Sequence, residues 1–304
     1  MHVEPPSGAE AGTPPAGANP TLTVVVTTKD RPHLVRRALA SARQVPVPVQ
    51  LVVVDDGSQE PYQADASDVA VVRHDSSRGA NAARNSGLAA ATARWVVFLD
   101  DDDELVGEGI GRAVRDLEGW DSDEIAVLGT LVSVDEGTGR QESHVPLPLP
   151  RGADWLAGPR FQGRHAHNGL VVSARQLRSV GGFDEQIRAW THDELFLRLL
   201  LAVELRTIPD AVYLMYENPA RSTLRQQQLN RVDGILRTLE RHDALHGPNR
   251  VVTANLMSAA GMHYARARRW ADARRAFTQA VRADPSRRVI WVRLARSLSG
   301  QSAS

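Results

Sequence analysis

Short apolar runs alternate with amphipathic helical stretches over the first third of the chain. β-Branched runs at residues 21–28, 49–55, 69–74 and 94–99 predict four buried strands. Helical patterns lie between them, and in the first of these Pro32 occupies the first turn and Asp30 is placed to cap the helix. Strands that alternate with helices at this spacing predict an α/β fold with a mostly parallel sheet flanked by helices.

The rest of the chain divides into a mixed part and a wholly helical part. Strands are expected at 123–134, 170–173 and 211–216, a loop at 146–169, and a helix with an acidic start at 190–205. From about Ser222 the pattern is only helical. We therefore expect a disordered tail at 1–20, an α/β domain at 21–221 and an all-α extension at 222–304.

The helical extension contains a hairpin pattern at about 254–287. Six residues there fall at the spacing of a tetratricopeptide repeat: Gly261, Tyr264, Ala273, Phe277, Ala280 and Pro285. One such hairpin cannot bury its own apolar face, so it must pack on neighbouring helices. We expect it to cover the preceding domain or to form a homodimer, with a platform for a partner peptide as the alternative.

The composition is that of an ordinary globular protein, and it limits the classes of function. Formal net charge is zero, which does not favour nucleic acid as a partner. The absence of cysteine excludes disulfides and thiol nucleophiles and fits a reducing cytoplasm. Residues 1–20 lack the features of a secretory signal, and no apolar run has the length of a transmembrane segment. We expect a cytoplasmic protein, with any membrane contact peripheral at the inner face.

Four consecutive aspartates, Asp100 to Asp103, follow the fourth predicted strand. Polar residues also end the first two strands, and the carboxyl ends of parallel strands are where such sheets bind ligands. Clustered carboxylates with few histidines select a hard cation such as Mn²⁺ or Mg²⁺, and leave coordination positions for phosphate oxygens. The cluster therefore fits a clamp for a diphosphate. Neither a P-loop nor a dinucleotide fingerprint follows the first strand.

Residues 22 to about 217 resemble the family 2 nucleotide-sugar glycosyltransferases, which have the GT-A fold. The resemblance rests, in the family's order, on "VVVTTKDRPHLVRRALAS", "LVVVDDGS", "RGANAARNSGLAAATARWVVFLDDDD", "VGGFDE" and "HDELFLRL". It implies metal-dependent transfer of a sugar, with inversion, from a nucleoside-diphosphate sugar, with a UDP-sugar favoured. The favoured acceptor is a cell-envelope, lipid-linked or secreted glycan. The helical end makes a peptide the second candidate acceptor.

The resemblance implies roles for residues around the nucleotide. Thr27 and Asp30 close the first strand, where the nucleobase is held. Asp56 resembles the residue that bonds the base. Arg78 or Arg84 would lie near the base and phosphates, and the sequence does not tell the two apart.

The aspartate cluster occupies the position of the family's DxD motif. By resemblance, Asp102 is the direct metal ligand, Asp100 supports the metal and Asp101 lies near the ribose. Asp103 fits a cap of the following helix instead. Tyr216 stands where many relatives carry a histidine near the metal, so the third ligand is left open between water, phosphate and a loop histidine, His165 or His167.

The inverting members of the family use a carboxylate at a helix start to take the acceptor's proton. The matching stretch "THDELFLRL" makes Asp193 the candidate base and Glu194 the runner-up, with the helix dipole favouring the ionised form. His192 replaces the family's usual Glu, and the spacing to Arg198 is one residue short, so the choice of base stays open. The side chain of Trp190 is equally suited to stacking on a sugar ring and to a buried position in the core.

Two other classes of function were weighed. A nucleotidyltransferase would carry a glycine-rich loop after the first strand, and "TTKDRP" has no glycine. A non-catalytic scaffold is disfavoured because four neighbouring carboxylates without a cation would cost stability.

Overall fold

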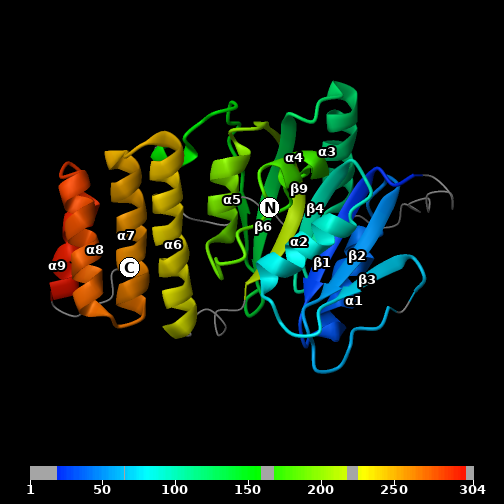
Figure 1. The fold of residues 1–304 in the computed structure, drawn as a ribbon, viewed down its shortest axis with the longest axis horizontal. Coiled ribbons are helices and arrows are strands. Elements are labelled where there is room, and N and C mark those ends of the chain that lie inside the picture. The colour runs from blue at the N-terminus through cyan, green and yellow to red at the C-terminus, as the bar shows by residue number, and fades with distance from the viewer. Residues whose placement is uncertain (1–18, 65, 159–167, 218–224, 299–304) are drawn as a thin grey trace.

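The structure is a computed structural model that describes residues 19–64, 66–158, 168–217 and 225–298 (Figure 1). The predicted tail falls almost wholly outside these ranges, as do His165 and His167. The strands are β1 (Leu22–Thr28), β2 (Val49–Asp55), β3 (Val69–Arg73), β4 (Trp95–Asp100), β5 (Glu104–Leu105), β6 (Ile125–Asp135), β7 (Gln141–His144), β8 (Val172–Ser173) and β9 (Glu204–Glu217). The helices are α1 (Pro32–Ala42), α2 (Ala80–Ala90), α3 (Gly107–Trp120), the 3₁₀ helix η1 (Trp155–Ala157), α4 (Ala174–Ser179), α5 (Thr191–Leu199), α6 (Arg225–His246), α7 (Arg250–Arg266), α8 (Trp270–Ala283) and α9 (Arg288–Leu298).

The main sheet has the strand order β3-β2-β1-β4-β8, and this confirms the predicted fold class. The first four of these strands are parallel and β8 is antiparallel at the edge. In this register Thr28 pairs with Asp55 and Thr27 pairs with Asp100. The polar ends of β1, β2 and β4 therefore meet at one edge of the sheet, as the sequence predicts.

The two faces of the main sheet are covered by different helices. Along β1, Val24 and Val26 face the core that α1 and α3 complete, whereas Val25 faces the core that α2, α4 and α5 complete. This alternation follows from the two-residue period of a strand. Because both faces are buried, the central strands read in the sequence as continuous apolar runs.

A second sheet, of order β5-β9-β6-β7, contains one element that the sequence assigned wrongly. The helix expected to reach residue 205 ends at Leu199, and β9 begins at Glu204. From there β9 pairs in parallel with β6, starting with Ile125 opposite Glu204. A long pairing between segments far apart in the chain outweighs the local helical pattern.

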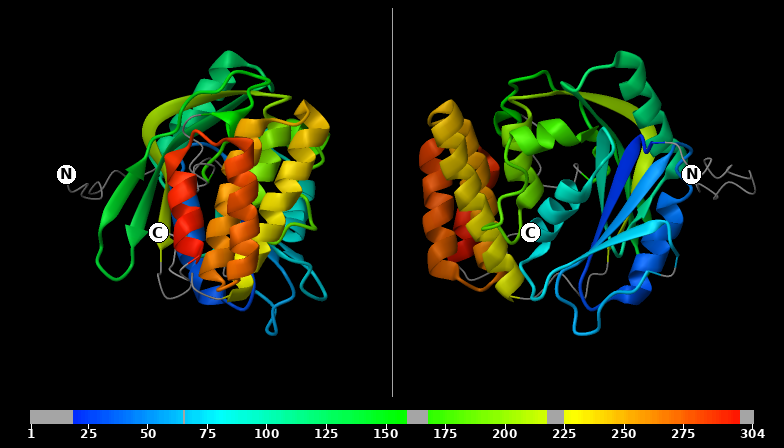
Figure 2. Two further views of the ribbon diagram at one scale, coloured as in Figure 1. Left: turned by 90° about the vertical axis from the view of Figure 1, so that its left-hand side faces the viewer. Right: turned by 45° about the vertical axis from the view of Figure 1, so that its right-hand side comes forward.

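The helices α6 to α9 form a layer that lies beside α5, on the side of the molecule away from β3 (Figures 1 and 2). Their apolar core continues into the preceding segment, because Leu197 of α5 and Leu156 of η1 are buried in it. Within the layer, Gly261 of α7 faces the ring of Phe277 on α8 so closely that an added Cβ would lie 2.5 Å from a ring atom. The tetratricopeptide character of the pair stays a prediction. Among the described residues, no helix is both long and apolar enough to cross a bilayer.

Candidate active site at the edge of the main sheet

The four aspartates after β4 alternate between buried and partly exposed positions. The Asp101 and Asp103 side chains are buried, whereas those of Asp100 and Asp102 are 35% and 24% exposed. Asp101 accepts a 2.7 Å hydrogen bond from the hydroxyl of Thr28. Two of the four carboxylates thus point toward solvent at the strand edge, and the other two are held from inside.

Asp103 joins the cluster to β9. Its carboxylate accepts hydrogen bonds of 2.9 Å from the hydroxyl of Tyr213 and from the backbone N–H of Tyr216. Burial, together with the neighbouring charge of Asp100, raises the pKa of Asp103 to about 8. The predicted helix cap is wrong, because α3 begins only at Gly107 and has no side-chain cap. Asp103 instead fixes the position of the loop that carries the exposed aspartates.

Arginines offset the charge of the cluster. Arg31, in the loop after β1, contacts Asp101 at 2.6 Å and Asp102 at 2.9 Å. Burial raises the pKa of Asp101 to about 6, against the opposing effects of Thr28 and Arg31. Arg84 of α2 contacts Asp100 at 2.7 Å. The pKa of Asp100 lies below its usual range, because the charges of Arg84 and then His192 outweigh the effect of burial.

The structure separates the two arginines that the sequence left as alternatives. Arg84 is almost fully buried beside the aspartates, with its guanidinium over the ring of Phe183 at 5.5 Å. Arg78 is exposed, and its nearest acidic partner is Glu185 at 3.4 Å. Of the two, Arg84 therefore lies beside the aspartates, and Arg78 lies at the exposed surface.

Asp56 is the centre of a tightly bonded loop. Its Oδ1 accepts from the His74 ring at 2.7 Å and from the Arg78 N–H at 2.8 Å, and its Oδ2 accepts from Ser77 at 2.7 Å and the Gly79 N–H at 2.9 Å. Burial acts to raise the pKa of Asp56, but these donors outweigh it and lower the pKa below its usual value. Asp56 thus orders the loop from 74 to 79 at the end of β3.

Asp30 does not cap α1, contrary to the prediction. It lies in a left-handed backbone conformation (φ 57°), and α1 begins at Pro32 without a side-chain cap. Its Oδ1 accepts a 2.7 Å hydrogen bond from the N–H of Gln59, and its own N–H donates to Ser58. Asp30 therefore holds the turn after β2 against the turn after β1. Thr27 lies beside it, half-buried at the end of β1.

His192 and Asp193, in the first turn of α5, have different surroundings. His192 lines a pocket with Phe98 of β4 and with Leu195 and Phe196 of its own helix. Asp193 does not line this pocket. Burial raises the pKa of Asp193 to about 7, which acts against the ionised form that a helix N-terminus favours.

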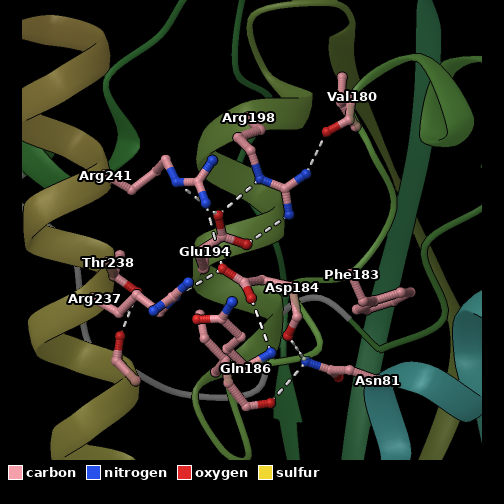
Figure 3. Close-up of polar contacts among 12 residues, drawn as sticks. Asn81, Val180, Phe183, Asp184, Gln186, Glu194, Arg198, Arg237, Thr238 and Arg241 are labelled. Atoms are coloured by element: carbon pink, nitrogen blue, oxygen red, sulfur yellow. Dashed lines mark hydrogen bonds and ion pairs between the residues drawn. The ribbon is translucent and has the colours of Figure 1, made fainter.

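Glu194 is fully buried in an ion-pair network between α5 and α6 (Figure 3). Both of its oxygens accept hydrogen bonds from Arg198, at 2.7 and 2.6 Å, and Arg241 of α6 lies 3.7 Å away. Asp184 completes the network, with Arg237 at 2.8 Å and Arg241 at 3.3 Å. This network holds the "GGFDE" turn, α5 and α6 together.

The remaining predicted residues have structural surroundings. Trp190 packs in the core of the helical layer, with its ring 6.1 Å from that of His263. Tyr216 lies under the guanidinium of Arg37 at 4.1 Å. In the described part of the chain, no group of three or more His, Asp or Glu side chains is arranged to hold a metal ion.

Sequence reasoning missed the direct partners of the aspartates. Arg31, Thr28 and Tyr213 each contact the cluster from a different element. Arg31 and Thr28 lie in the quoted "TTKDRP" stretch, so a search there for a counter-charge could have found Arg31. Tyr213 carried no such signal, because it reaches the cluster only through the pairing of β9.

The chain was compared with protein families and curated proteins. Residues 23–171 match the family described as glycosyl transferase family 2. The pre-mycofactocin glycosyltransferase of Mycobacterium tuberculosis is 30% identical over an alignment of 230 residues, and the alignment covers 69% of this chain and 44% of that protein. The succinoglycan biosynthesis protein ExoU of Rhizobium meliloti is 30% identical over 146 residues, 44% of this chain and 41% of that protein. The chain thus spans less than half the length of these relatives.

Solved structures show the same fold over nearly the whole chain. The S. aureus TarS structure covers 92% of this chain with a TM-score of 0.61 at 17% identity, and 53% of TarS is matched. A shorter TarS chain, residues 1–349 in complex with UDP-GlcNAc, gives a TM-score of 0.56 at 16% identity, with 92% of each chain covered. At such identities the similarity establishes the arrangement of the elements.

Proposed function

The chain belongs to glycosyl transferase family 2, and on this premise we propose that it transfers a sugar from a nucleoside-diphosphate sugar to an acceptor hydroxyl. The observation that carries the proposal is the edge where β1, β2 and β4 end. Asp100 and Asp102 point outward there, and Arg84 and Arg31 lie beside them. Exposed carboxylates next to arginines can hold a diphosphate through a bridging cation and through direct contacts.

The two exposed aspartates fit a divalent cation of the Mn²⁺ or Mg²⁺ type. Carboxylate oxygens are hard ligands, and two of them leave positions for phosphate oxygens and water. Asp102 is the proposed direct ligand and Asp100 the support, whereas Asp101 and Asp103 are occupied by Thr28, Tyr213 and backbone contacts. When bound, such a cation would neutralise the charge that develops on the leaving diphosphate.

The nucleotide is proposed to lie along the ends of β1 and β2. Thr27, Asp30 and the loop that Asp56 orders would form the nucleobase side of the site. Arg78 lies on the rim of that loop, and Arg84 lies between it and the aspartates. In this proposal the base would lie at the loop that Asp56 orders, and the phosphates and the cation beside Arg84 and the aspartates.

The proton acceptor is proposed to lie at the start of α5, and the sequence makes Asp193 its candidate. The runner-up, Glu194, is unsuitable because Arg198 engages both of its oxygens and it is fully buried. With both oxygens engaged and no exposed surface, Glu194 has no room to contact an acceptor. Attack opposite the leaving diphosphate would invert the anomeric carbon.

For the donor, we propose a UDP-sugar, and for the acceptor a glycan. The similar TarS chain is described in complex with UDP and with UDP-GlcNAc, and ExoU is described as a succinoglycan biosynthesis protein. These descriptions support the donor and acceptor classes without specifying the sugar. A homodimer through the C-terminal helices stays a prediction, consistent with the exposed apolar side chains of Val289, Val292 and Leu298 on α9.

Thermal unfolding with and without ligands tests the proposal. UDP together with Mn²⁺ should raise the melting temperature by more than either ligand alone, because both bind only the folded state. UDP release from UDP-GlcNAc in the presence of Mn²⁺, measured without added acceptor, then tests turnover with water. The absence of any UDP-dependent shift with Mn²⁺ or Mg²⁺ would contradict the proposed site.

A further inference from the structure

His192 is the residue at the start of α5 that faces the aspartate edge of the sheet. It lines the pocket that also includes Phe98 of β4, two residues before Asp100. Its ring meets the edge of Phe183, with centroids 6.0 Å apart. Phe183 in turn packs against Phe98 at 5.0 Å and lies under the guanidinium of Arg84. His192 is therefore connected by direct ring contacts to the strand and the arginine that border the proposed phosphate position.

Asp193 lies about 100° further round the same helix than His192. Residues three and four apart share a helix face. His192 shares its face with Leu195 and Phe196, which both pack against the main sheet. Asp193 shares its face with Phe196 and with Leu197, which is buried in the core of the helical layer. His192 is thus turned toward the main sheet, and Asp193 toward the boundary between the sheet and the helical layer.

The electrostatic surroundings agree with this division. His192 is among the groups that lower the pKa of Asp100, which agrees with the two side chains lying near each other, and the neutral ring is the form that accepts a proton. For Asp193, burial is the dominant influence, and no residue of the aspartate cluster acts on it.

The helical layer fixes the rotation of α5 that produces this arrangement. Gly234 of α6 approaches the backbone before α5 so closely that an added Cβ would lie 2.1 Å from the carbonyl oxygen of Ala189. Five residues after Ala189, Glu194 of α5 pairs with Arg198 and lies 3.7 Å from Arg241 of the same helix α6. A close backbone contact at one end and a buried ion pair in the next turn leave α5 little freedom to rotate Asp193 toward the sheet.

We propose that His192, rather than Asp193, contacts the acceptor and takes its proton. The acceptor oxygen forms a bond to the anomeric carbon while the bond from that carbon to the diphosphate oxygen breaks. The electron pair of the broken bond leaves with the diphosphate. The hydroxyl proton moves to a ring nitrogen of His192 and passes from there to solvent. This assignment deepens the proposed function and rests on it.

Paired variants at the two adjacent positions test the assignment. His192→Ala and His192→Gln should lower kcat for Mn²⁺-dependent hydrolysis of UDP-GlcNAc by about 100-fold or more, with KM nearly unchanged. Asp193→Asn tests the competing assignment and should lower kcat by a smaller factor than either His192 variant. All three variants should keep the melting-temperature shift that UDP and Mn²⁺ produce. Loss of turnover in Asp193→Asn together with near-normal turnover in both His192 variants would overturn the assignment.

A second measurement does not depend on the identity of the donor sugar. Bound Mn²⁺ broadens the NMR signals of nearby nuclei, so Mn²⁺ with UDP should broaden the ring signal of His192, identified by its absence in His192→Ala. The ring of His246, in the last turn of α6, serves as the distant control. A sharp His192 signal under conditions where UDP and Mn²⁺ raise the melting temperature would overturn the inference alone. A wild type that shows no such rise overturns the proposed function, and the inference with it.

Discussion

Arg31 donates a 2.9 Å hydrogen bond to Asp102, the aspartate that we propose as the direct cation ligand. The same guanidinium contacts the buried Asp101 at 2.6 Å. An arginine thus supplies positive charge at the place where a divalent cation is proposed to act. Cation binding must then compete with Arg31 or move it toward the phosphates, and the first two predictions follow from this relationship.

Asp102→Asn should abolish the effect of Mn²⁺ on UDP binding. The substitution keeps the size of the side chain but removes the charge of the proposed direct ligand. We expect hydrolysis of UDP-GlcNAc to fall by about 100-fold or more. Asp116→Asn on α3, where the aspartate only faces Arg112 at 3.7 Å, is the control and should behave as wild type. An unchanged Mn²⁺-dependent melting shift in Asp102→Asn would exclude Asp102 as a ligand.

Arg31→Gln should destabilise the protein and make it more responsive to Mn²⁺ alone. Without Arg31, the carboxylates of Asp101 and Asp102 lose their closest cation, at a cost of about 1 kcal/mol because the arginine is partly exposed. For a chain of this size, a loss of about 1 kcal/mol lowers the melting temperature by about 2–4 °C. Mn²⁺ should restore much of the loss. Arg36→Gln, at an exposed position of the helix α1 that follows Arg31, controls for general charge effects, and equal Mn²⁺ responses in both variants would contradict the prediction.

Arg198→Met should be strongly destabilising, because it leaves the buried Glu194 without its main partner. Breaking a buried ion pair from one side costs about 3–5 kcal/mol. Adding Glu194→Gln to this variant removes the stranded charge and should recover part of the loss. Urea unfolding of the two single variants and the double variant gives the coupling energy. A coupling near zero would mean that the pair in Figure 3 does not stabilise α5.

Gly261→Ala should destabilise the α7–α8 pair by about 1–3 kcal/mol. The new Cβ would lie within 2.5–2.9 Å of the fully buried ring of Phe277, which has no room to move away. Gly119→Ala, near the end of α3, is the matched control because nothing lies within 4 Å of its new Cβ. That control should be neutral or more stable by up to about 1 kcal/mol. Calorimetry on both variants checks the difference, and equal effects would rule out the close packing of α7 on α8.

The stability of the protein should fall with acid in a window set by His263. Burial lowers the pKa of His263 to about 3 from its ordinary value of 6.5. Between pH 6.5 and 3 the unfolded chain binds a proton at His263 that the folded chain does not bind. The free energy of unfolding is therefore unaffected by His263 above pH 6.5 and decreases as the pH falls from 6.5 toward 3. His263→Asn can still donate to Gln228, the 2.7 Å partner of the ring. It should flatten the decline of melting temperature between pH 6.5 and 4.5, and an unchanged slope would contradict this account.

Most of the main sheet could be predicted from local patterns. The runs that become β1, β2 and β4 are buried on both faces, and such strands are apolar at every position, so they stand out in the sequence. The sequence predicts β9 as a strand only over residues 211–216, and it extends the preceding helix into the first two residues of β9. Residues 204–210 become a strand through pairing with β6, which lies about 80 residues earlier in the chain.

The candidate site could be predicted as a location, but the contacts within it could not. The alternation of strands and helices places the ends of β1, β2 and β4 together, so Thr27, Asp56 and Asp100 were found. The counter-charges Arg31 and Arg84 come from the elements that follow β1 and precede β4, and only their packing brings them to the aspartates. The resemblance could suggest that one of Arg78 and Arg84 matters, but it could not say which.

The sequence by itself determined the edge of the sheet at which chemistry is proposed, because strands that alternate with helices run parallel and bring their polar carboxyl ends to the same edge. The tertiary structure decided which side chain of "THDE" faces that edge. A helix turns by about 100° per residue, so adjacent residues point to different neighbours. Whether His192 or Asp193 meets the sheet depends on how α6 packs against α5, and that contact joins residues 40 or more positions apart.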